Sequence, residues 1–336
     1  MPYSKITFGI QTGQQEASWE QIRECWLELE ELGFDDLWVY DHYLPTGTQN
    51  DSGEVNDAWT LLAALSQVVK RPRLGTMVTS MTFRHPVVLA KMATTIDHAS
   101  HGRVNLGLGA GWYEPEHSAY GIYYPNLRER MDRLGEATDL IKSLWTKART
   151  TFEGKHFKVV DAPFEPKPLQ KPHPPILIGG GGEQRTLNLV ARHADNWNWI
   201  PSAPIDVYKR KLSILHKHCA SVGRDPDEIQ QSLNPDFIIS DDPTRIDHAL
   251  AKNAQSIGKP VGQIRDSWIV GNPEEVTRKL QAFIDLGVTS FVFALRPPFD
   301  QPSKNRIPDL ENRMMRYHTT MDDVRRLARE VLPNLR

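Results

Sequence analysis

The sequence predicts a closed (β/α)8 barrel, the TIM-barrel fold, that carries insertions. Eight strand-like runs alternate with amphipathic helical segments along the 336 residues, which is the pattern of a parallel barrel. Several of these runs end in glycine or small polar residues, as strands do where an α/β protein binds its ligand. An open doubly wound sheet is the alternative fold. It is disfavoured because the first strand–helix turn, Thr12-Gly13-Gln14-Gln15, lacks a Gly-x-Gly-x-x-Gly fingerprint.

In the first half of the chain, short runs of strand formers are separated by segments whose apolar residues recur at helical spacing. The predicted strands are Lys5–Gln11, Phe34–Tyr40, Leu74–Thr79 and Val104–Gly109. The predicted helices are Trp19–Leu32, Ala58–Val69, a helix opened by Pro86 that carries Leu89, Met92, Ala93 and Ile96, and Leu127–Trp145. Asp57 is placed to cap the second helix, and Pro86 stands in a first turn, where proline is tolerated.

The second half continues this alternation after an interruption. A hairpin is predicted at Thr151–Val160 with its turn at Glu153-Gly154, and the proline-dense segment Pro163–Pro175 cannot enter a central strand. The remaining predicted strands are Ile176–Ile178, Asn196–Ile200, Gln231–Ile239 and Ser290–Leu295, and the remaining helices are Glu183–His193, Ile205–Val222, Glu274–Leu286 and Leu310–Val331. We expect a single domain over residues 1–336, with insertions at about 112–126, 151–174 and 241–268.

Composition and charge are those of an ordinary soluble enzyme. Hydrophobic residues make up 39%, charged residues 24%, and the net charge is −2, so nothing favours nucleic acid or an anionic membrane as a partner. No stretch approaches the roughly 18 apolar residues of a spanning helix, and a signal peptide is not recognisable, so a cytoplasmic protein is expected. Cys25 and Cys219 form no disulfide framework, and the histidines lack metal-ligand spacing. We predict no metal site.

Four glycines follow the predicted strand Ile176–Ile178 and lead toward a helix. In Gly179-Gly180-Gly181-Gly182-Glu183-Gln184-Arg185, several backbone N–H groups can turn toward one anion, and Arg185 can add a compensating charge. The segment is therefore a candidate phosphate site. The alternative is a flexible turn, although four consecutive glycines carry an entropy cost that a turn alone does not require.

Asp41 and His42 follow the predicted strand Phe34–Tyr40, at the end of the barrel where catalytic groups gather. A histidine there can exchange a proton with a substrate near neutral pH, and the neighbouring carboxylate can bind a cofactor hydroxyl or ring nitrogen. An Asp-His pair is also a common loop cap, which is the structural alternative.

The third and fourth predicted strands offer a surface for a flat ring. Thr76, Val78 and Ser80 alternate along one side of the third strand, although ordinary core packing explains this equally. The glycines Gly107, Gly109 and Gly111 leave one side of the fourth strand bare, with Trp112 and Tyr113 at its mouth. These glycines can instead serve only to relieve crowding inside the barrel. No Gly-x-Ser-x-Gly elbow or Gly-Lys-Ser/Thr loop is present, which disfavours hydrolases and kinases.

An ordered set of motifs resembles one known family. They are Leu37-Trp38-Val39-Tyr40-Asp41-His42, Leu74-Gly75-Thr76, His85-Pro86, Leu89-Ala90-Lys91, Ala93-Thr94, Asp97, Ser100-His101-Gly102-Arg103, Gly107-Leu108-Gly109-Ala110-Gly111-Trp112 and Ile178 to Gly182. The chain resembles the bacterial luciferase-like family from Ile6 to about Val222 and again from Gly271 to Phe293. Within it, the chain is most similar to the coenzyme F420-dependent oxidoreductases, rather than to luciferase itself or the alkanesulfonate monooxygenases.

The resemblance implies a deazaflavin or flavin at the C-terminal mouth of the barrel and hydride transfer at C5 or N5 of its ring. It assigns His42 as the catalytic acid/base. It assigns cofactor contacts to Asp41, Thr76, Val78, Thr79, Ser80, Gly109, Gly111, Gly180, Gly181, Gly182 and Gln184, of which the loop glycines and Gln184 would hold a phosphate. It also implies a possible cis peptide bond after Val78 or Thr79.

One position departs from the sugar-phosphate dehydrogenases of this branch. They carry a glutamate directly after the glycine that matches Gly111, whereas this chain has Trp112, with Glu114 two residues later. Glucose 6-phosphate is therefore disfavoured as a substrate. A more apolar substrate pocket is expected, formed by Trp38, Trp59, Trp112 and Tyr113 with Glu114 nearby.

Three functions follow from these expectations. The leading one is an oxidoreductase that transfers a hydride between coenzyme F420 and a small organic substrate. The second is an FMN-dependent monooxygenase that receives reduced flavin from a partner reductase, and the third is a non-catalytic flavin-binding protein. Retention of Asp41, His42 and the glycine loop argues against the third. The resemblance also implies a homodimer.

Overall fold

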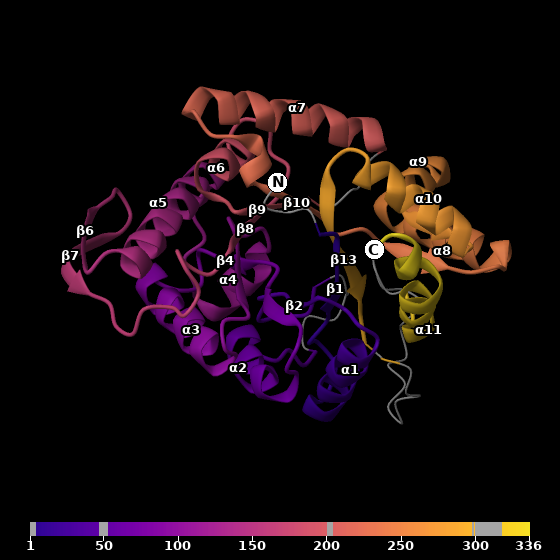
Figure 1. The fold of residues 1–336 in the computed structure, drawn as a ribbon, viewed down its shortest axis with the longest axis horizontal. Coiled ribbons are helices and arrows are strands. Elements are labelled where there is room, and N and C mark those ends of the chain that lie inside the picture. Colours follow the sequence, from indigo (N-terminus) through magenta and orange to yellow (C-terminus); the bar gives the residue numbers. More distant parts are fainter. Residues whose placement is uncertain (1–4, 47–52, 200–203, 298, 300–317) are drawn as a thin grey trace.

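The computed structural model describes residues 5–46, 53–199, 204–297, 299 and 318–336. Within them, eight parallel strands close into a barrel, with β3 paired to both β2 and β5. In barrel order they are β1 (Thr7–Thr12), β2 (Asp36–Val39), β3 (Arg73–Thr76), β5 (Val104–Gly109), β8 (Ile176–Gly179), β9 (Asn196–Trp199), β10 (Gln230–Leu233) and β13 (Val288–Leu295), which pairs with β1. Figure 1 shows the strands at the centre with helices around them. The predicted closed barrel is confirmed, and the open sheet is excluded.

Amphipathic helices cover the outside of the barrel. They are α1 (Trp19–Glu31), α2 (Ala58–Val68), α3 (Pro86–Ala99), α5 (Leu127–Thr146), α6 (Thr186–His193), α7 (Ile205–Val222) and α10 (Pro273–Ile284). On α1, Ile22, Trp26 and Leu29 are buried at helical spacing. Asp57 caps α2 as predicted, because its carboxylate accepts from the Thr60 N–H at 2.8 Å. Helix α6 begins three residues later than predicted, since the glycine-rich turn continues to Arg185.

The third strand is interrupted, so the continuous strand predicted at Leu74–Thr79 is wrong. β3 ends at Thr76, and β4 (Thr79–Ser80) follows a cis peptide bond between Met77 and Val78. A cis bond was expected here, but it lies one residue before the first expected position. The alternation of faces is lost at this point, because the side chains of Met77 and Val78 both lie in the barrel interior, with Trp38 and Leu177.

The predicted strand Gln231–Ile239 is divided in two. Its first part is β10 of the barrel, and its second part, β11 (Phe237–Ile239), pairs outside the barrel with β12 (Ile269–Gly271). Between β11 and β12, the insertion predicted at about 241–268 folds into α8 (Pro243–Ile257) and α9 (Val261–Ser267). These elements share a small hydrophobic core of their own, formed by Ile238, Ile246, Ala249, Leu250, Ala254, Ile264, Trp268 and Val270.

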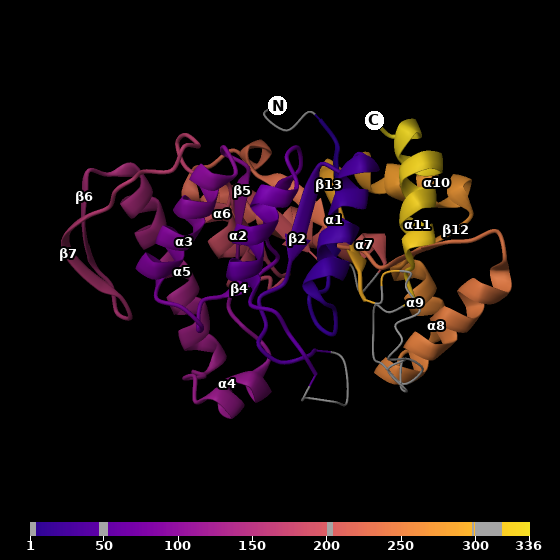
Figure 2. The same ribbon diagram turned by 90° about the horizontal axis from the view of Figure 1, so that it is seen from below.

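The hairpin lies at the opposite edge of the molecule from α8 and α9 (Figure 2). Its strands, β6 (Arg149–Glu153) and β7 (Lys158–Pro163), are longer than predicted. The turn is also longer than a two-residue turn at Glu153-Gly154, because the Gly154 N–H donates to the Phe157 carbonyl at 2.9 Å. The carboxylate of Glu136 on α5 accepts from the N–H groups of this loop, at 2.9 Å from Lys155 and 2.8 Å from His156.

The predicted helix Leu310–Val331 is shorter than expected in the described residues. Its first part, 310–317, lies outside them, and α11 (Met321–Arg326) begins after a Thr320 cap. A π-helical turn (Leu327–Val331) and a 3-10 turn (Leu332–Asn334) complete the chain's last helical segment. No helix in the described part of the chain is long and apolar enough to cross a membrane.

A short helix that the sequence pattern did not predict, α4 (Glu114–Tyr120), follows β5. Figure 2 shows it projecting beyond the strands on the side opposite both chain termini. This is the side to which the strands point their carboxyl ends, where barrel enzymes assemble their sites.

Candidate active site

His42 is held by a carboxylate that the sequence analysis did not identify. It lies just beyond β2, and its Nδ1 is 2.8 Å from Oε1 of Glu116 on α4. The other oxygen of Glu116 accepts from the Tyr43 N–H at 2.8 Å. Glu116 is 1% exposed. A carboxylate that accepts at Nδ1 keeps the proton there and leaves Nε2 of the neutral imidazole free to accept a proton.

Aromatic side chains surround this imidazole. The ring centroid of His42 lies 5.6 Å from that of Trp112 and 6.0 Å from that of Tyr113, both edge-on, and 5.7 Å from that of Tyr40. Trp112 and Tyr113 therefore lie beside His42, as expected for a substrate pocket, and Trp112 is 65% exposed. Glu114 is exposed on the first turn of α4 and makes no described contact with His42.

Glu116, and not Glu114, reaches His42, and helix geometry explains why. Pro115 marks a helix start, which was the signal available in the sequence. On a helix, residues two positions apart point about 200° away from each other. When Glu116 faces His42, Glu114 must therefore face solvent.

Asp41 forms a buried ion pair with Arg84, which opens the turn before α3. The Arg84 guanidinium donates to Asp41 Oδ2 through Nη1, and through Nη2 to Asp57 Oδ2 at 2.7 Å. Burial raises the pKa of the Asp41 carboxyl, and the neighbouring Arg84 charge opposes this rise. The second oxygen of Asp41 is buried and lacks a partner with hydrogen-bond geometry among the described residues, although the Thr79 hydroxyl lies nearby.

The glycines of β5 and β8 make room for Val78. A Cβ on Gly109 would lie 2.5 Å from Val78 Cγ2, and a Cβ on Gly179 would lie 3.1 Å from Val78 Cγ1. At Gly107, a Cβ would lie 1.8 Å from the Thr76 carbonyl oxygen. The bare side of these strands is thus filled by the bulge after the cis bond, and Val78 forms part of the inner surface at the mouth.

Thr76 and Thr79 point into the barrel wall. The Thr76 hydroxyl donates to the Gly107 carbonyl at 3.1 Å, and the Thr79 hydroxyl lies 3.0 Å from that of Thr76. Trp59 on α2 is 1% exposed and donates its indole N–H to Thr79 Oγ1 at 2.9 Å. Trp38 is also buried, inside the barrel. Neither tryptophan lines an open surface in this structure. That Trp38 and Trp59 contact the substrate, and that Thr76 and Thr79 contact the cofactor, stay predictions.

Ser80, at the end of β4, begins a short chain of polar groups. Its hydroxyl lies 2.6 Å from that of Thr82, which in turn lies 2.6 Å from Nε2 of His117 on α4. Gly111 passes directly over Ser80 with a φ of 80°, and a Cβ there would lie 2.3 Å from Ser80 Oγ. Ser80 and Gly111 are therefore neighbours, as their proposed shared role in cofactor binding requires.

The glycine loop folds tightly against α6 and β9. A Cβ on Gly181 would lie 2.8 Å from the Trp199 indole nitrogen, and a Cβ on Gly182 would lie 2.8 Å from Thr186 Oγ1. The Gly180 N–H donates to the Asn198 carbonyl at 2.9 Å, so this predicted donor is already engaged. No described residue accepts a hydrogen bond from the N–H groups of Gly181 through Gln184, so these donors remain available to an anion. The side chain of Gln184 is exposed. The loop fits a phosphate group.

The prediction that Arg185 adds a positive charge at the glycine loop is wrong, because its side chain binds residues of α5 instead. Arg185 donates to the Arg128 carbonyl at 3.0 Å and pairs with Asp132 on α5. Lys211 on α7 approaches the loop instead, donating to the Gly181 carbonyl at 2.6 Å. The sequence offered no signal for this residue, because α7 meets the loop only in the folded chain.

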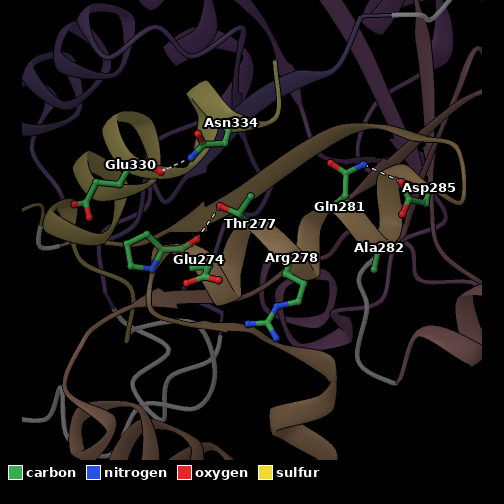
Figure 3. A pocket seen from close by; sticks show the side chains of 9 residues that line it. Glu274, Thr277, Arg278, Gln281, Ala282, Asp285, Glu330 and Asn334 are labelled. Atoms are coloured by element: carbon green, nitrogen blue, oxygen red, sulfur yellow. Dashed lines mark hydrogen bonds between the residues drawn. The ribbon is translucent and has the colours of Figure 1, made fainter.

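A surface groove lies away from these residues, outside the barrel. It runs between α10 and the last turns of the chain, and Figure 3 shows Thr277 of α10 on the side of Asn334, whereas Arg278 points away from Glu330 and Asn334. None of the predicted site residues lines it. In the described residues, no cluster of three or more histidine, cysteine or acidic side chains is arranged to hold a metal ion.

Comparison with known proteins identifies the family of this chain. Residues 3–259 match the family model described as luciferase-like monooxygenase. The chain is 28% identical over 311 residues to an F420-dependent glucose-6-phosphate dehydrogenase of Kineococcus radiotolerans, covering 86% of this chain and 90% of the relative. It is 30% identical over 311 residues to a protein of the same name from Microbacterium testaceum, covering 86% and 91%.

A solved structure shows the shared fold. The coenzyme F420-dependent tetrahydromethanopterin reductase of Methanopyrus kandleri superposes with a TM-score of 0.77 at 19% identity, covering 99% of this chain and 100% of that one. The family match extends over most of the chain and includes His42, the interrupted third strand and the glycine loop. This chain belongs to the luciferase-like monooxygenase family.

Proposed function

We propose that this protein is an F420-dependent oxidoreductase that transfers a hydride between the deazaflavin and a small organic substrate. The observation that carries the proposal is the His42–Glu116 pair, which stands at the barrel mouth among aromatic side chains. The glycine loop supplies a second, anion-binding element at the same end of the barrel. Two relatives that are 28% and 30% identical are named as F420-dependent dehydrogenases, which favours this cofactor.

The protein's part in the reaction is to bind, orient and move one proton. When bound, the deazaflavin supplies the carbon that accepts or gives the hydride. Nε2 of His42 takes the hydroxyl proton as a substrate is oxidised, or returns it when the reaction runs the other way. Glu116 fixes the proton on Nδ1 and stabilises the imidazolium that results.

The glycine loop is proposed to hold the phosphate of the cofactor tail. The free N–H groups of Gly181, Gly182 and Gln184 would donate to the phosphate oxygens, and Lys211 would contribute a nearby positive charge. Asp41, Val78, Ser80, Gly109 and Gly111 are the remaining proposed neighbours of the ring.

The substrate is proposed to present an apolar group to Trp112 and Tyr113. Both rings stand edge-on to His42. By the family resemblance, Trp112 occupies the position at which the sugar-phosphate dehydrogenases carry a glutamate. Glucose 6-phosphate is therefore expected to give no turnover, whereas uncharged secondary alcohols or the corresponding ketones are the first compounds to assay. Turnover of glucose 6-phosphate comparable to that of the uncharged compounds would contradict this.

The first experiment is a titration of the apoprotein with coenzyme F420 and, separately, with FMN, followed by tryptophan fluorescence. Tight binding of F420 alone supports the proposal. Preference for FMN favours a monooxygenase that takes reduced flavin from a partner reductase, and binding of neither contradicts the proposed role of the glycine loop. Light scattering of the same samples tests the proposed homodimer.

His42→Ala separates catalysis from binding. Because the side chain is proposed to handle only the proton, this variant should bind F420 as the wild type does and lose hydride transfer. Unchanged turnover would exclude His42 as the acid/base. A wild type that binds F420 but turns over no substrate would favour the non-catalytic alternative.

A further inference from the structure

We infer that His117 is a positioning residue for the proposed proton transfer, because its contact with Thr82 fixes helix α4 and thereby keeps Glu116 against His42. The inference rests on the proposed function, since it concerns the pair that would move the proton. The sequence pattern assigned neither His117 nor Thr82 to the site.

Helix α4 is too short to be stable by itself. It has seven residues, Glu114–Tyr120, and isolated helices of this length do not persist in water without tertiary contacts. The residue before it, Tyr113, provides no side-chain cap. Of the seven residues only Glu116 and His117 are buried, and Figure 2 shows the helix projecting beyond the strands. The position of α4 therefore depends mainly on these two side chains.

The two buried residues attach α4 to two different segments. Consecutive helical residues point about 100° apart. Glu116 faces the loop after β2, where its carboxylate binds His42. His117 faces the turn after β4, where its Nε2 is 2.6 Å from Thr82 Oγ1 and its ring stacks on Phe83 at a centroid distance of 4.8 Å. A helix with one attachment can turn about that point, whereas two attachments fix its orientation.

The turn after β4 is itself firmly held, which makes it a suitable anchor. The Phe83 N–H donates to the Ser80 carbonyl at 3.2 Å, and the Thr82 hydroxyl lies 2.6 Å from that of Ser80. Ser80 belongs to β4, which pairs with β5 of the barrel. Through Thr82, His117 is therefore connected to the barrel wall by short hydrogen bonds.

The hydrogen bonds of His117 have one consistent direction. Nδ1 lies 2.9 Å from the Tyr113 carbonyl oxygen, which can only accept, so Nδ1 carries the proton. Nε2 of the neutral ring then accepts from the Thr82 hydroxyl. The imidazole is fully buried, and its centroid lies 4.7 Å from that of the Tyr124 ring. A side chain that fills this space without an acceptor for Thr82 should therefore loosen α4.

The first test measures hydride transfer and F420 affinity in His117→Phe, which keeps a ring and removes both hydrogen bonds. Single-turnover absorbance at saturating F420 should show a rate about tenfold lower than that of the wild type, because Glu116 is less precisely placed. F420 affinity should be unchanged. His117→Gln keeps an acceptor within reach of Thr82 and should restore part of the rate. The exposed Ser118→Ala on the same helix is the matched control and should keep the wild-type rate. A wild-type rate in His117→Phe would overturn the inference.

Double variants test whether His117 acts through Glu116 and through Thr82. Glu116→Gln should lower the rate more than His117→Phe does, and adding His117→Phe to it should cause no further loss, since the pair that His117 positions is already broken. Thr82→Val removes the same contact from the other side. Thr82→Val, His117→Phe and their double variant should therefore have similar rates. Multiplied losses in either double variant would overturn the inference.

The tautomer of His42 can be measured without any cofactor. Nitrogen-15 NMR of the apoprotein should show the His42 proton on Nδ1 in the wild type and in Ser118→Ala, because Glu116 accepts it there. In His117→Phe and Thr82→Val a share of this proton should move to Nε2, which a general loss of stability would not cause. An unchanged His42 tautomer in both variants would overturn the inference.

The proposed function and the role of His117 can fail separately. If the wild type binds neither F420 nor FMN, the proposed function fails, while the NMR measurement still shows whether His117 positions Glu116 against His42. If the wild type transfers hydride and His117→Phe does so at the same rate with His42 in the same tautomer, only the inference fails.

Discussion

At the mouth of the barrel, two charged side chains hold the groups proposed to bind and react. Glu116 on α4 orients His42, and Arg84 neutralises Asp41 in a contact that also includes Asp57. Both are buried or nearly so, and both come from segments far from their partners in sequence. Their removal should have different consequences, because Glu116 sets the protonation of a base whereas Arg84 balances a buried charge.

Glu116→Gln should lower the rate of hydride transfer by about 100-fold with F420 affinity unchanged. An amide can donate to Nδ1, which favours the tautomer with its proton on Nε2, and it no longer stabilises the imidazolium. Single-turnover absorbance at saturating F420 measures the rate. Glu114→Gln is the matched control two residues away on the same helix, and it should keep the wild-type rate. Equal rates in both variants would exclude the proposed role of Glu116.

Arg84→Met should lower the free energy of unfolding by about 3 kcal/mol, because it leaves the buried Asp41 carboxylate without its counter-charge. Adding Asp41→Asn should recover much of this loss, and urea denaturation of both variants measures it. The exposed pair of Arg149 and Asp161 provides the control, since Arg149→Met should lower the free energy of unfolding far less than Arg84→Met does. A double variant less stable than Arg84→Met would contradict the argument.

At the scale of elements, the third strand determines the shape of the inner surface. Its interruption between β3 and β4 turns Val78 toward the space that Gly109 leaves open. The amide of Gln11 on β1, two strands away, donates to the Met77 carbonyl, so the bulge is also held by a second strand. The glycines of β5 are thus explained by packing against a neighbouring strand, whatever they contribute to binding.

Gly109→Ala should destabilise the fold by about 2 kcal/mol, because its methyl would lie 2.5 Å from Val78 Cγ2. Val78→Ala removes the atoms with which the new methyl would clash. The loss of unfolding free energy in the double variant should therefore be about 1 kcal/mol smaller than the sum of the losses in Gly109→Ala and Val78→Ala. Chemical denaturation of the four proteins measures this coupling.

Gly107→Ala is the matched control for that cycle. Its methyl would lie 1.8 Å from the Thr76 carbonyl oxygen, which belongs to the backbone. Val78→Ala should therefore give no comparable rescue of Gly107→Ala. Rescue at both glycines, or at neither, would contradict the assignment of the Gly109 contact to Val78.

At the scale of the whole molecule, the barrel could be predicted because each of its units is local. Apolar periodicity marks helices such as α1, and the caps at Asp57 and Asn272 require only neighbours in sequence. The alternation of strand and helix then restricts the topology to very few folds. The cofactor site at the barrel mouth and the cis bond were predicted from the family resemblance. The spacing of apolar residues gives no information about either.

The remaining features depend on contacts between distant residues. Glu116 is 74 positions from His42, and nothing in either local sequence indicates that they meet. Helices α8 and α9 pack on a two-stranded sheet outside the barrel. Their apolar residues therefore belong to a second hydrophobic core, and this segment does not continue the strand–helix repeat of the barrel. Arg185 pairs with Asp132 on α5, and Lys211 from α7 donates to the glycine loop, which are both contacts between residues far apart in sequence.

The floor of the barrel, opposite the mouth, contains a buried acid that should make stability depend on pH. Asp36 opens β2 and is 6% exposed, and burial raises its pKa to about 6, against the opposing effects of Arg73 and Asn105. In the unfolded chain the same carboxyl ionises near its ordinary value of 3.8. Between these two values the folded protein holds a proton that the unfolded chain has lost, so stability falls as pH rises through the window.

Asp36→Asn removes this titration and should be more stable than the wild type at neutral pH. A pKa raised by two units means that Asp36 lowers the free energy of unfolding of the wild type by about 3 kcal/mol above pH 7. About 1 kcal/mol of this loss is already present at pH 4.5. The difference in unfolding free energy between variant and wild type should therefore grow by about 2 kcal/mol from pH 4.5 to 7.5. Urea denaturation at several pH values measures this difference, in which groups common to both proteins cancel. A difference that stays constant across the range would show that Asp36 ionises in the folded barrel as it does in the unfolded chain.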